Sequence, residues 1–107
     1  MTAIQINKTQ FEQWMAEGKT VVVDYWAPWC GYCRRIGPAY DKIAEEYGDR
    51  LAVAKVNIDE EPQLTEAQGV EVIPTLVLYK NGQAVQRVVA PKTKAAIDEF
   101  LQQGLTQ

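Results

Sequence analysis

The sequence predicts an α/β fold with a central mixed sheet of five strands flanked by four helices. Segments of strand and helix character alternate along most of the 107 residues, and strand–helix–strand units imply parallel pairing. The dipeptide Asn81-Gly82 then signals a hairpin between the last two strands, which adds antiparallel pairing. No repeat or linker divides the chain, so residues 1–107 are expected to form a single domain.

The first expected elements are a short strand and a helix. Ala3–Ile6 is a short apolar stretch that fits an edge strand. Thr9 is followed three residues later by Glu12, which is the pattern of a capping box and places the helix start at Thr9. Gly18 is expected to end this helix.

The next strand is expected at the centre of the sheet. Val21–Trp26 (VVVDYW) is β-branched, aromatic and nearly all apolar, which predicts a strand buried on both faces. A helical pattern then follows Cys30 and runs to Tyr47, with Gly48 as its stop. Pro38 lies inside that pattern, so a kink is expected there.

The second half of the chain continues the alternation and closes with the hairpin and a helix. Its expected elements are a strand at Leu51–Ile58, a short helix from Pro62 to about Gln68, strands at Thr75–Lys80 and Ala84–Val89, and a helix at Thr93–Gln103.

Composition and charge exclude some classes of function. The net charge is −3 and the pI is near 4.9, so the chain has no general attraction for nucleic acid. No apolar run approaches the length of a membrane span. Residues 1–8 lack the pattern of a signal peptide. We therefore expect a soluble cytoplasmic protein, although a transit peptide that had been removed would leave no trace.

The two cysteines, Cys30 and Cys33, are separated by only two residues. A disulfide between them closes a loop of four residues and would stabilise the fold by roughly 2 kcal/mol, against about 3 for a fifteen-residue loop. The chain contains no histidine, so Cys₂His₂ and Cys₃His zinc sites cannot form within it. A zinc or iron–sulfur site shared between chains stays open, but a redox-active pair is the better interpretation.

The position of the pair assigns a role to each sulfur. Cys30 falls at a helix start, where free N–H groups and the helix dipole favour a thiolate and lower its pKa. Cys33 lies one turn further on and should be more buried. We therefore expect Cys30 to attack the substrate and Cys33 to resolve the mixed disulfide.

Asp24 and Lys55 are candidate catalytic residues because each is a charged residue in an apolar strand pattern. A buried carboxyl is rare unless it is paired or functional, and Asp24 could take the proton of Cys33 through a water. In the alternative interpretation Asp24 faces solvent. Lys55 is the expected partner of Asp24, or else a solvated lysine at a strand edge.

The run WAPWCGYC, followed by Pro38, Asp59, Ile73-Pro74-Thr75 and Gly82, closely resembles the thioredoxin family. The resemblance extends from about residue 3 to residue 103. It implies the thioredoxin fold and reduction of protein disulfides by a dithiol cycle without a tightly bound cofactor. It also implies regeneration by a thioredoxin reductase, either NADPH-linked or ferredoxin-linked. We expect a monomer.

Six further residues are expected to bind substrate: Trp29, Gly31, Tyr32, Ile73, Pro74 and Ala90. Trp29, next to Cys30, is interpreted as a wall of the substrate groove. The resemblance implies a cis peptide bond between Ile73 and Pro74, where the backbone of Ile73 can pair with an extended substrate. The alternative is a trans proline that only begins a strand and has no role in binding substrate. Ala90 lies in a loop that borders the groove.

Two positions depart from the family pattern. The dipeptide between the cysteines is Gly31-Tyr32 in place of the usual Gly-Pro, and Ala90 stands where the family usually has glycine. Tyr32 has a backbone N–H that proline lacks. We expect this N–H to donate to the Cys30 sulfur and to make the protein a slightly weaker reductant than a Gly-Pro relative.

Three functions therefore remain in competition. The first is a protein-disulfide reductase of the thioredoxin type. The second is a disulfide isomerase or glutaredoxin-like enzyme, prompted by the aromatic residue Tyr32. The third is a thioredoxin-fold binding module in which the thiols are incidental.

The acidic run 59–61 is interpreted simply as a solvated helix start.

Overall fold

The computed structural model describes residues 2–107 and confirms the predicted order of the elements. Those elements are β1 (Ile4–Gln5), α1 (Lys8–Ala16), β2 (Val21–Trp26), α2 (Gly31–Tyr47), β3 (Ala52–Asn57), α3 (Pro62–Ala67), β4 (Thr75–Lys80), β5 (Gln83–Val89) and α4 (Lys94–Leu105).

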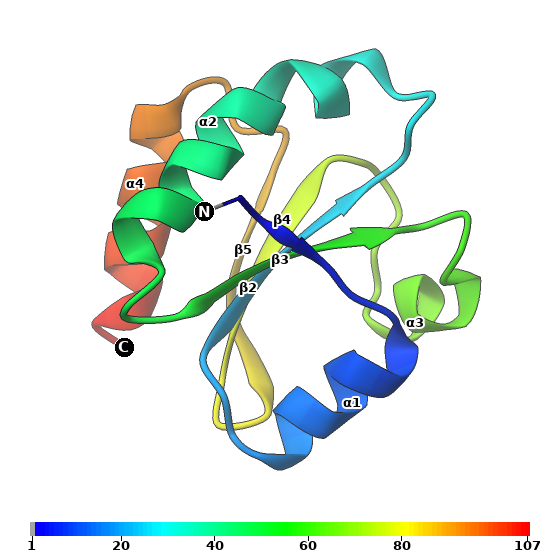
Figure 1. Cartoon of the computed structure of the whole chain (residues 1–107), viewed down its shortest axis with the longest axis vertical. Coiled ribbons are helices and arrows are strands. Elements are labelled where there is room, and N and C mark those ends of the chain that lie inside the picture. The colour runs from blue at the N-terminus through cyan, green and yellow to red at the C-terminus, as the bar shows by residue number, and fades with distance from the viewer. Residues whose placement is uncertain (1) are drawn as a thin grey trace.

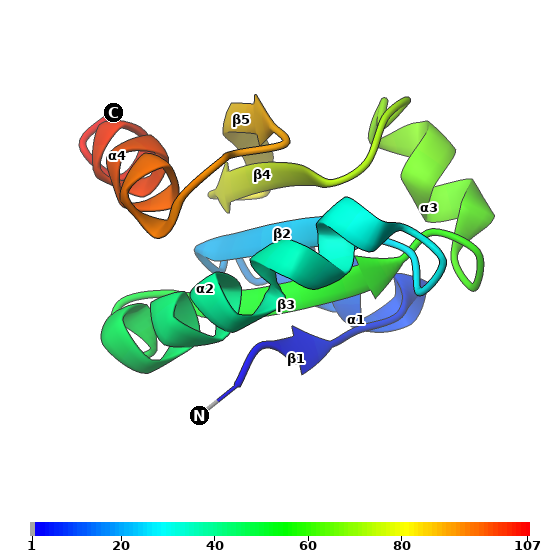
Figure 2. The same cartoon turned by 90° about the horizontal axis from the view of Figure 1, so that it is seen from above.

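The five strands form one mixed sheet in the order β1-β3-β2-β4-β5, and Figure 2 shows them side by side in this order. β3 pairs in parallel with β1 and β2, whereas β4 pairs antiparallel with β2 and β5. The central position of β2 follows from its sequence, because a strand of almost only apolar residues must be covered on both faces. β1 lies at the edge, as expected.

The helices cover both faces of the sheet. α2 and α4 lie on one face, and α1 and α3 lie on the other (Figure 1). Successive side chains of a strand point to opposite faces, so Val22 packs with α2 and α4 while Val21 and Val23 pack with α1 and α3. Asp24 shares the direction of Val22, and its side chain therefore lies on the α2 face.

The hairpin between β4 and β5 has the predicted geometry. Asn81 and Gly82 adopt φ values of 55° and 81°, the left-handed pair that a two-residue turn of type I′ requires. A side chain at Gly82 would also approach the carbonyl oxygen of Met15 to 3.0 Å. Both constraints explain why the turn ends on glycine.

The predicted start of the first helix was wrong. Asn7, not Thr9, is the N-cap of α1: its side chain accepts from the N–H of Gln10, and the Gln10 side chain accepts from the Asn7 N–H. Glutamine serves as well as glutamate in such a box, and asparagine is among the strongest N-caps. Thr9 and Glu12 therefore lie inside the helix.

The other boundaries differ from the expected ones by at most a few residues. Pro38 lies inside α2 as predicted. Thr93 caps α4 by accepting from the N–H of Ala96 at 3.1 Å. Among residues 2–107, none of the helices combines the length and apolar character needed to cross a membrane.

Candidate active site

The two cysteines lie where the polypeptide passes from the carboxyl end of β2 into α2. Cys30 is the N-cap of α2, and Cys33 lies in its first turn. The structure shows the pair as a disulfide, with the two Cα atoms 5.3 Å apart. Cys33 is only 3% exposed, whereas Cys30 is half-buried. The predicted difference in access between the two sulfurs is therefore present.

The Cys30 sulfur receives a hydrogen bond from the helix backbone. Its donor is the N–H of Cys33, 3.2 Å from Sγ, one of the N–H groups that a helix start leaves without a carbonyl partner. In the disulfide form that the structure describes, the donor is therefore Cys33 and not Tyr32. The bond expected from the Tyr32 N–H to the reduced Cys30 thiolate, with its effect on reducing power, stays a prediction.

Asp24 is buried in β2, on the face of the sheet that α2 and α4 cover. It is 1% exposed, and its Oδ1 is the one buried side-chain polar atom among the described residues that lacks a hydrogen-bond partner. Desolvation by burial raises the pKa of Asp24 to about 7, although the positive charge of Lys55 opposes this rise. A carboxyl with such a pKa can accept or release a proton near neutral pH.

Lys55 lies beside Asp24 but does not form an ion pair with it. The two residues are directly opposite in the parallel pairing of β2 and β3. The Lys55 ammonium instead lies 4.0 Å from the centre of the Trp26 ring, and none of the ion pairs within residues 2–107 involves Lys55. Lys55 therefore acts on Asp24 only through the electrostatic effect of its positive charge, and not through a direct contact.

Trp29 is exposed beside Cys30, and a residue of another loop fixes its side chain by a hydrogen bond. It is 66% exposed, and its indole N–H donates to Oδ2 of Asp59 at 2.7 Å. Asp59 was expected only to belong to a solvated acidic run, so its contact with Trp29 was not predicted. The signal that could have found it was position: Asp59 follows β3 and Trp29 follows β2, and parallel strands end at the same edge of a sheet.

The segment before β4 meets the loop after β5 at the same end of the sheet. The Ile73–Pro74 bond is cis, as the resemblance implied. The N–H of Ala90 donates to the carbonyl of Pro74 at 2.9 Å. Ala90 has a φ of 48°, which is the left-handed region where glycine is the usual residue. Ala90 therefore adopts a backbone conformation that glycine, the residue expected at this position, adopts more readily than alanine.

The dipeptide between the cysteines completes the structure of this end. Gly31 is exposed at the first residue of α2. The Tyr32 side chain reaches the loop after β5, where its hydroxyl donates to the carbonyl of Pro91 at 3.0 Å. The structure thus brings the predicted site residues together from β2, β3, α2 and the loops around β4 and β5.

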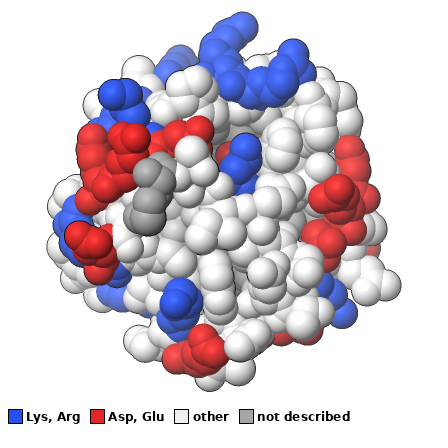
Figure 3. Space-filling view, viewed as in Figure 1, with Lys and Arg blue, Asp and Glu red and all other residues white. Residues whose placement is uncertain are grey.

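Charge is unevenly distributed around this end. Basic side chains gather over the first turns of α2, at the top of Figure 3, where the sequence places Arg34 and Arg35. The Arg34 guanidinium donates to the carbonyl of Pro28 at 2.7 Å and braces the cysteine loop.

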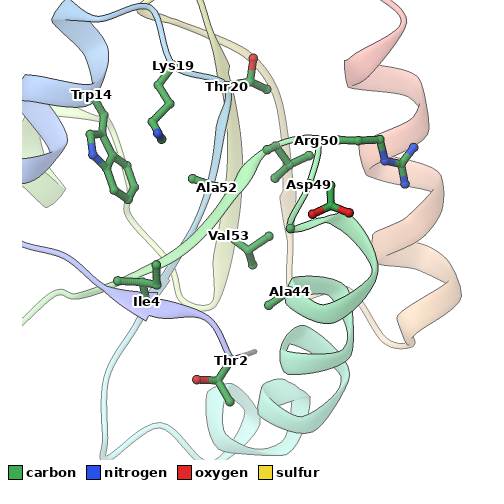
Figure 4. Close-up of a pocket in the computed structure, with 12 residues that line it drawn as sticks. Thr2, Ile4, Trp14, Lys19, Thr20, Ala44, Asp49, Arg50, Ala52 and Val53 are labelled. Carbon is green, nitrogen blue, oxygen red and sulfur yellow. The ribbon is translucent and has the colours of Figure 1, made fainter.

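A separate hollow of about 480 Å³ lies at the opposite end of the sheet. Residues before β2 and at the start of β3 line it, including Lys19, Thr20 and Ala52 (Figure 4). Its two cations contact aromatic rings, Lys19 that of Trp14 and Arg50 that of Tyr47. None of the predicted site residues lines this hollow, so it is not part of the redox site.

Comparison with known proteins agrees with this geometry. The thioredoxin family model matches residues 2–103. The chain is 40% identical to Thioredoxin 1 of Nostoc sp. over 96% of this chain and 97% of that protein. It is 44% identical to Thioredoxin 1 of Synechococcus elongatus, over 88% and 91%. A solved structure, a mutant thioredoxin from Halobacterium salinarum, superposes with a TM-score of 0.85 at 30% identity, covering 96% of this chain and 90% of that one.

A redox-active cysteine pair at a helix start, a fold of five strands and four helices, and similarity over nearly the whole chain lead to one assignment. The chain belongs to the thioredoxin family and is a thiol–disulfide oxidoreductase.

Proposed function

We propose that this chain, acting as a single domain, reduces disulfide bonds of other proteins through a reversible cycle of Cys30 and Cys33. The observation that carries the proposal is the asymmetry of the pair. Cys30 is accessible and accepts an N–H of α2, whereas Cys33 is buried behind it. One sulfur is therefore placed to meet a substrate, and the other to meet only its neighbour.

The first half of the cycle forms a mixed disulfide. The Cys30 thiolate attacks one sulfur of the substrate disulfide, and the S–S bond of the substrate breaks. The second substrate sulfur leaves as a thiolate and takes up a proton from solvent. Cys30 is now bonded to the substrate, and the helix start no longer carries a thiolate.

The second half resolves the mixed disulfide and completes the two-electron reduction of the substrate. The Cys33 thiol gives its proton to the Asp24 carboxylate through a water, and its thiolate attacks the Cys30 sulfur. The substrate's first sulfur leaves as a thiolate and is protonated. Two electrons have reached the substrate, and the protein is in the disulfide form that the structure shows.

The remaining residues are proposed to position the substrate. Trp29, held by Asp59, forms one wall of the groove. The backbone of Ile73, before cis Pro74, can pair with an extended substrate chain.

A reductase, NADPH-linked or ferredoxin-linked, would return two electrons to the disulfide. This activity suits a reducing compartment such as the cytoplasm and requires only a monomer.

The proposal is tested by insulin reduction with dithiothreitol as electron donor. Wild type should accelerate the reaction. Cys30→Ser should be inactive, and Cys33→Ser should accumulate long-lived mixed disulfides with insulin. Alkylation of the reduced protein at neutral pH should label Cys30 first. Faster labelling of Cys33 would reverse the assigned roles, and a wild type that fails to reduce insulin would favour a binding module.

The equilibrium redox potential against glutathione separates the two enzyme classes that Tyr32 left open. A potential close to that of reductases supports the proposal, and one close to that of disulfide isomerases contradicts it.

A further inference from the structure

The hydroxyl of Tyr32 ties two parts of the molecule that are distant in sequence. Tyr32 lies in the first turn of α2, and its hydroxyl donates to the carbonyl of Pro91 at 3.0 Å. The Arg35 guanidinium lies 5.8 Å from the centre of the same ring. Proline, the usual residue here in the family, has no side-chain donor, so the tie depends on tyrosine.

The loop that receives this bond contains the unfavourable backbone at Ala90. An alanine with a φ of 48° persists only where the surrounding structure holds it. Two bonds do so here. The Ala90 N–H donates to Pro74 on one side, and the carbonyl of Pro91, the next residue, receives the Tyr32 hydroxyl on the other. Pro91 adds a fixed φ and is itself buried.

These contacts join the three segments around the reactive pair. α2 is joined to the loop after β5 through Tyr32 and Pro91. The same loop is joined to the segment before β4 through Ala90 and Pro74. Trp29, Val72 and Val89 are the large apolar side chains left exposed at this end of the sheet. An extended substrate chain that packs on them would lie along the loop.

We propose that Tyr32 is a positioning residue for substrate specificity: its hydroxyl holds the Ala90–Pro91 loop as a rigid wall of the groove. This inference rests on the proposed reduction of protein disulfides. An extended polypeptide contacts this wall, so it binds more tightly when the wall is already formed before binding. A small disulfide that reaches only the Cys30 sulfur makes no use of it. The tie thus favours polypeptide disulfides over small ones.

The test compares insulin with a small aromatic disulfide, 5,5′-dithiobis(2-nitrobenzoic acid). Tyr32→Phe removes the hydroxyl and keeps the ring. We expect its ratio of kcat/KM for insulin to the rate constant for the small disulfide to fall roughly fivefold, the effect of one neutral hydrogen bond. The loss should appear mainly as a higher KM for insulin.

Tyr47→Phe is the matched control. It removes a tyrosine hydroxyl from the other end of α2, where that hydroxyl bonds Asp98 and Gln102. The insulin ratio of this variant should stay that of wild type.

A second readout follows the loop itself. Hydrogen exchange of the Ala90 amide in the oxidised protein should quicken roughly fivefold in Tyr32→Phe and stay unchanged in Tyr47→Phe. In an Ala90→Gly background, where a left-handed φ is readily adopted, Tyr32→Phe should change the insulin ratio less than twofold. Circular dichroism confirms that each variant is folded.

The outcomes separate the alternatives. A lower insulin ratio with unchanged hydrogen exchange of the Ala90 amide would mean that the Tyr32 hydroxyl contacts substrate directly. That result would overturn the proposal that the hydroxyl acts by holding the loop. Faster exchange with an unchanged ratio would show that the loop is not a wall of the groove and would also overturn the proposal. If the wild-type protein does not reduce insulin, the proposed function itself is contradicted, independently of the role of Tyr32.

Discussion

Asp24 and Tyr25 are consecutive residues of β2, and both bury a polar group in an apolar core. They point to opposite faces of the sheet. The Tyr25 hydroxyl lies 2.7 Å from that of Tyr79, which in turn donates to Gln68 at 3.0 Å. On the other face, Oδ1 of Asp24 has no hydrogen-bond partner.

The difference shows how the fold treats buried polar groups. Burial raises the pKa of Tyr79 to about 12 and that of Tyr25 still further, so both hydroxyls stay neutral and their hydrogen bonds are complete. Burial raises the pKa of Asp24 only to about 7. A fully paired group stabilises one structure, whereas an unpaired carboxyl that titrates near neutral pH is available for proton transfer.

The largest expected effect is on stability after Asp24→Asn. A carboxyl whose pKa rises from 3.8 to about 7 on folding destabilises the native state once it ionises. Wild-type stability should therefore fall as pH rises from about 4 to about 7 and then level off. The total loss is about 4 kcal/mol, and the variant should recover much of it at pH 8.

Urea unfolding of the oxidised proteins between pH 4 and pH 8 measures this effect. Asp49→Asn, which removes an exposed carboxylate, is the control and should keep the wild-type slope. If the gain from Asp24→Asn were the same at pH 5 as at pH 8, the carboxyl would not be the buried acid described above.

The next effect is kinetic. Asp24→Asn removes the group proposed to take the proton of Cys33, so release of reduced substrate from the mixed disulfide should slow on the order of a hundredfold at pH 7 to 8. In wild type the rate should rise with pH through about 7, because only the ionised carboxyl accepts a proton. Stopped-flow measurement of substrate release gives both results. Unchanged rates across this range would remove Asp24 from the mechanism.

Tyr25→Phe tests the paired face and should have a smaller effect. Tyr79 keeps its bond to Gln68 and loses only the hydrogen bond from Tyr25. Stability should fall by about 1 kcal/mol. The loss should be equal at pH 5 and pH 8, since the pKa of each tyrosine lies above that range. Insulin reduction should be unaffected; a slower reaction would mean that the two faces are not separate in function.

The smallest effect is expected from Lys55→Gln. Its positive charge lowers the pKa of Asp24, so its removal should raise that pKa further. The lysine is partly exposed and its field is screened by solvent. The midpoints of the stability and release profiles should therefore move to higher pH by only a fraction of a pH unit.

Lys19→Gln is the matched control for Lys55. It also removes a lysine that contacts a tryptophan ring, but at the other end of the sheet, and it should leave both midpoints in place. A midpoint that stays fixed in Lys55→Gln as well would show that Lys55 does not act on Asp24.

The order of residues along the chain was enough to predict the fold class, the succession of strands and helices and the reactive pair. The apolar run of β2 dictates a central strand, and the turn at Asn81-Gly82 dictates a hairpin, because in each case local chemistry permits few alternatives. The position of Cys30 at a helix start likewise follows from the change of pattern at residue 30. Local choices failed where two candidates competed, as with Asn7 and Thr9 for the cap of α1.

Which distant groups meet became known only from the folded chain. That Lys55 contacts a ring rather than pairing with Asp24 depends on side-chain geometry across two strands. The bonds from Trp29 to Asp59 and from Tyr32 to Pro91 join residues 30 and 59 positions apart. No local pattern encodes such contacts, because they arise from where the sheet places the ends of its strands, and one hydrogen bond then fixes each pair.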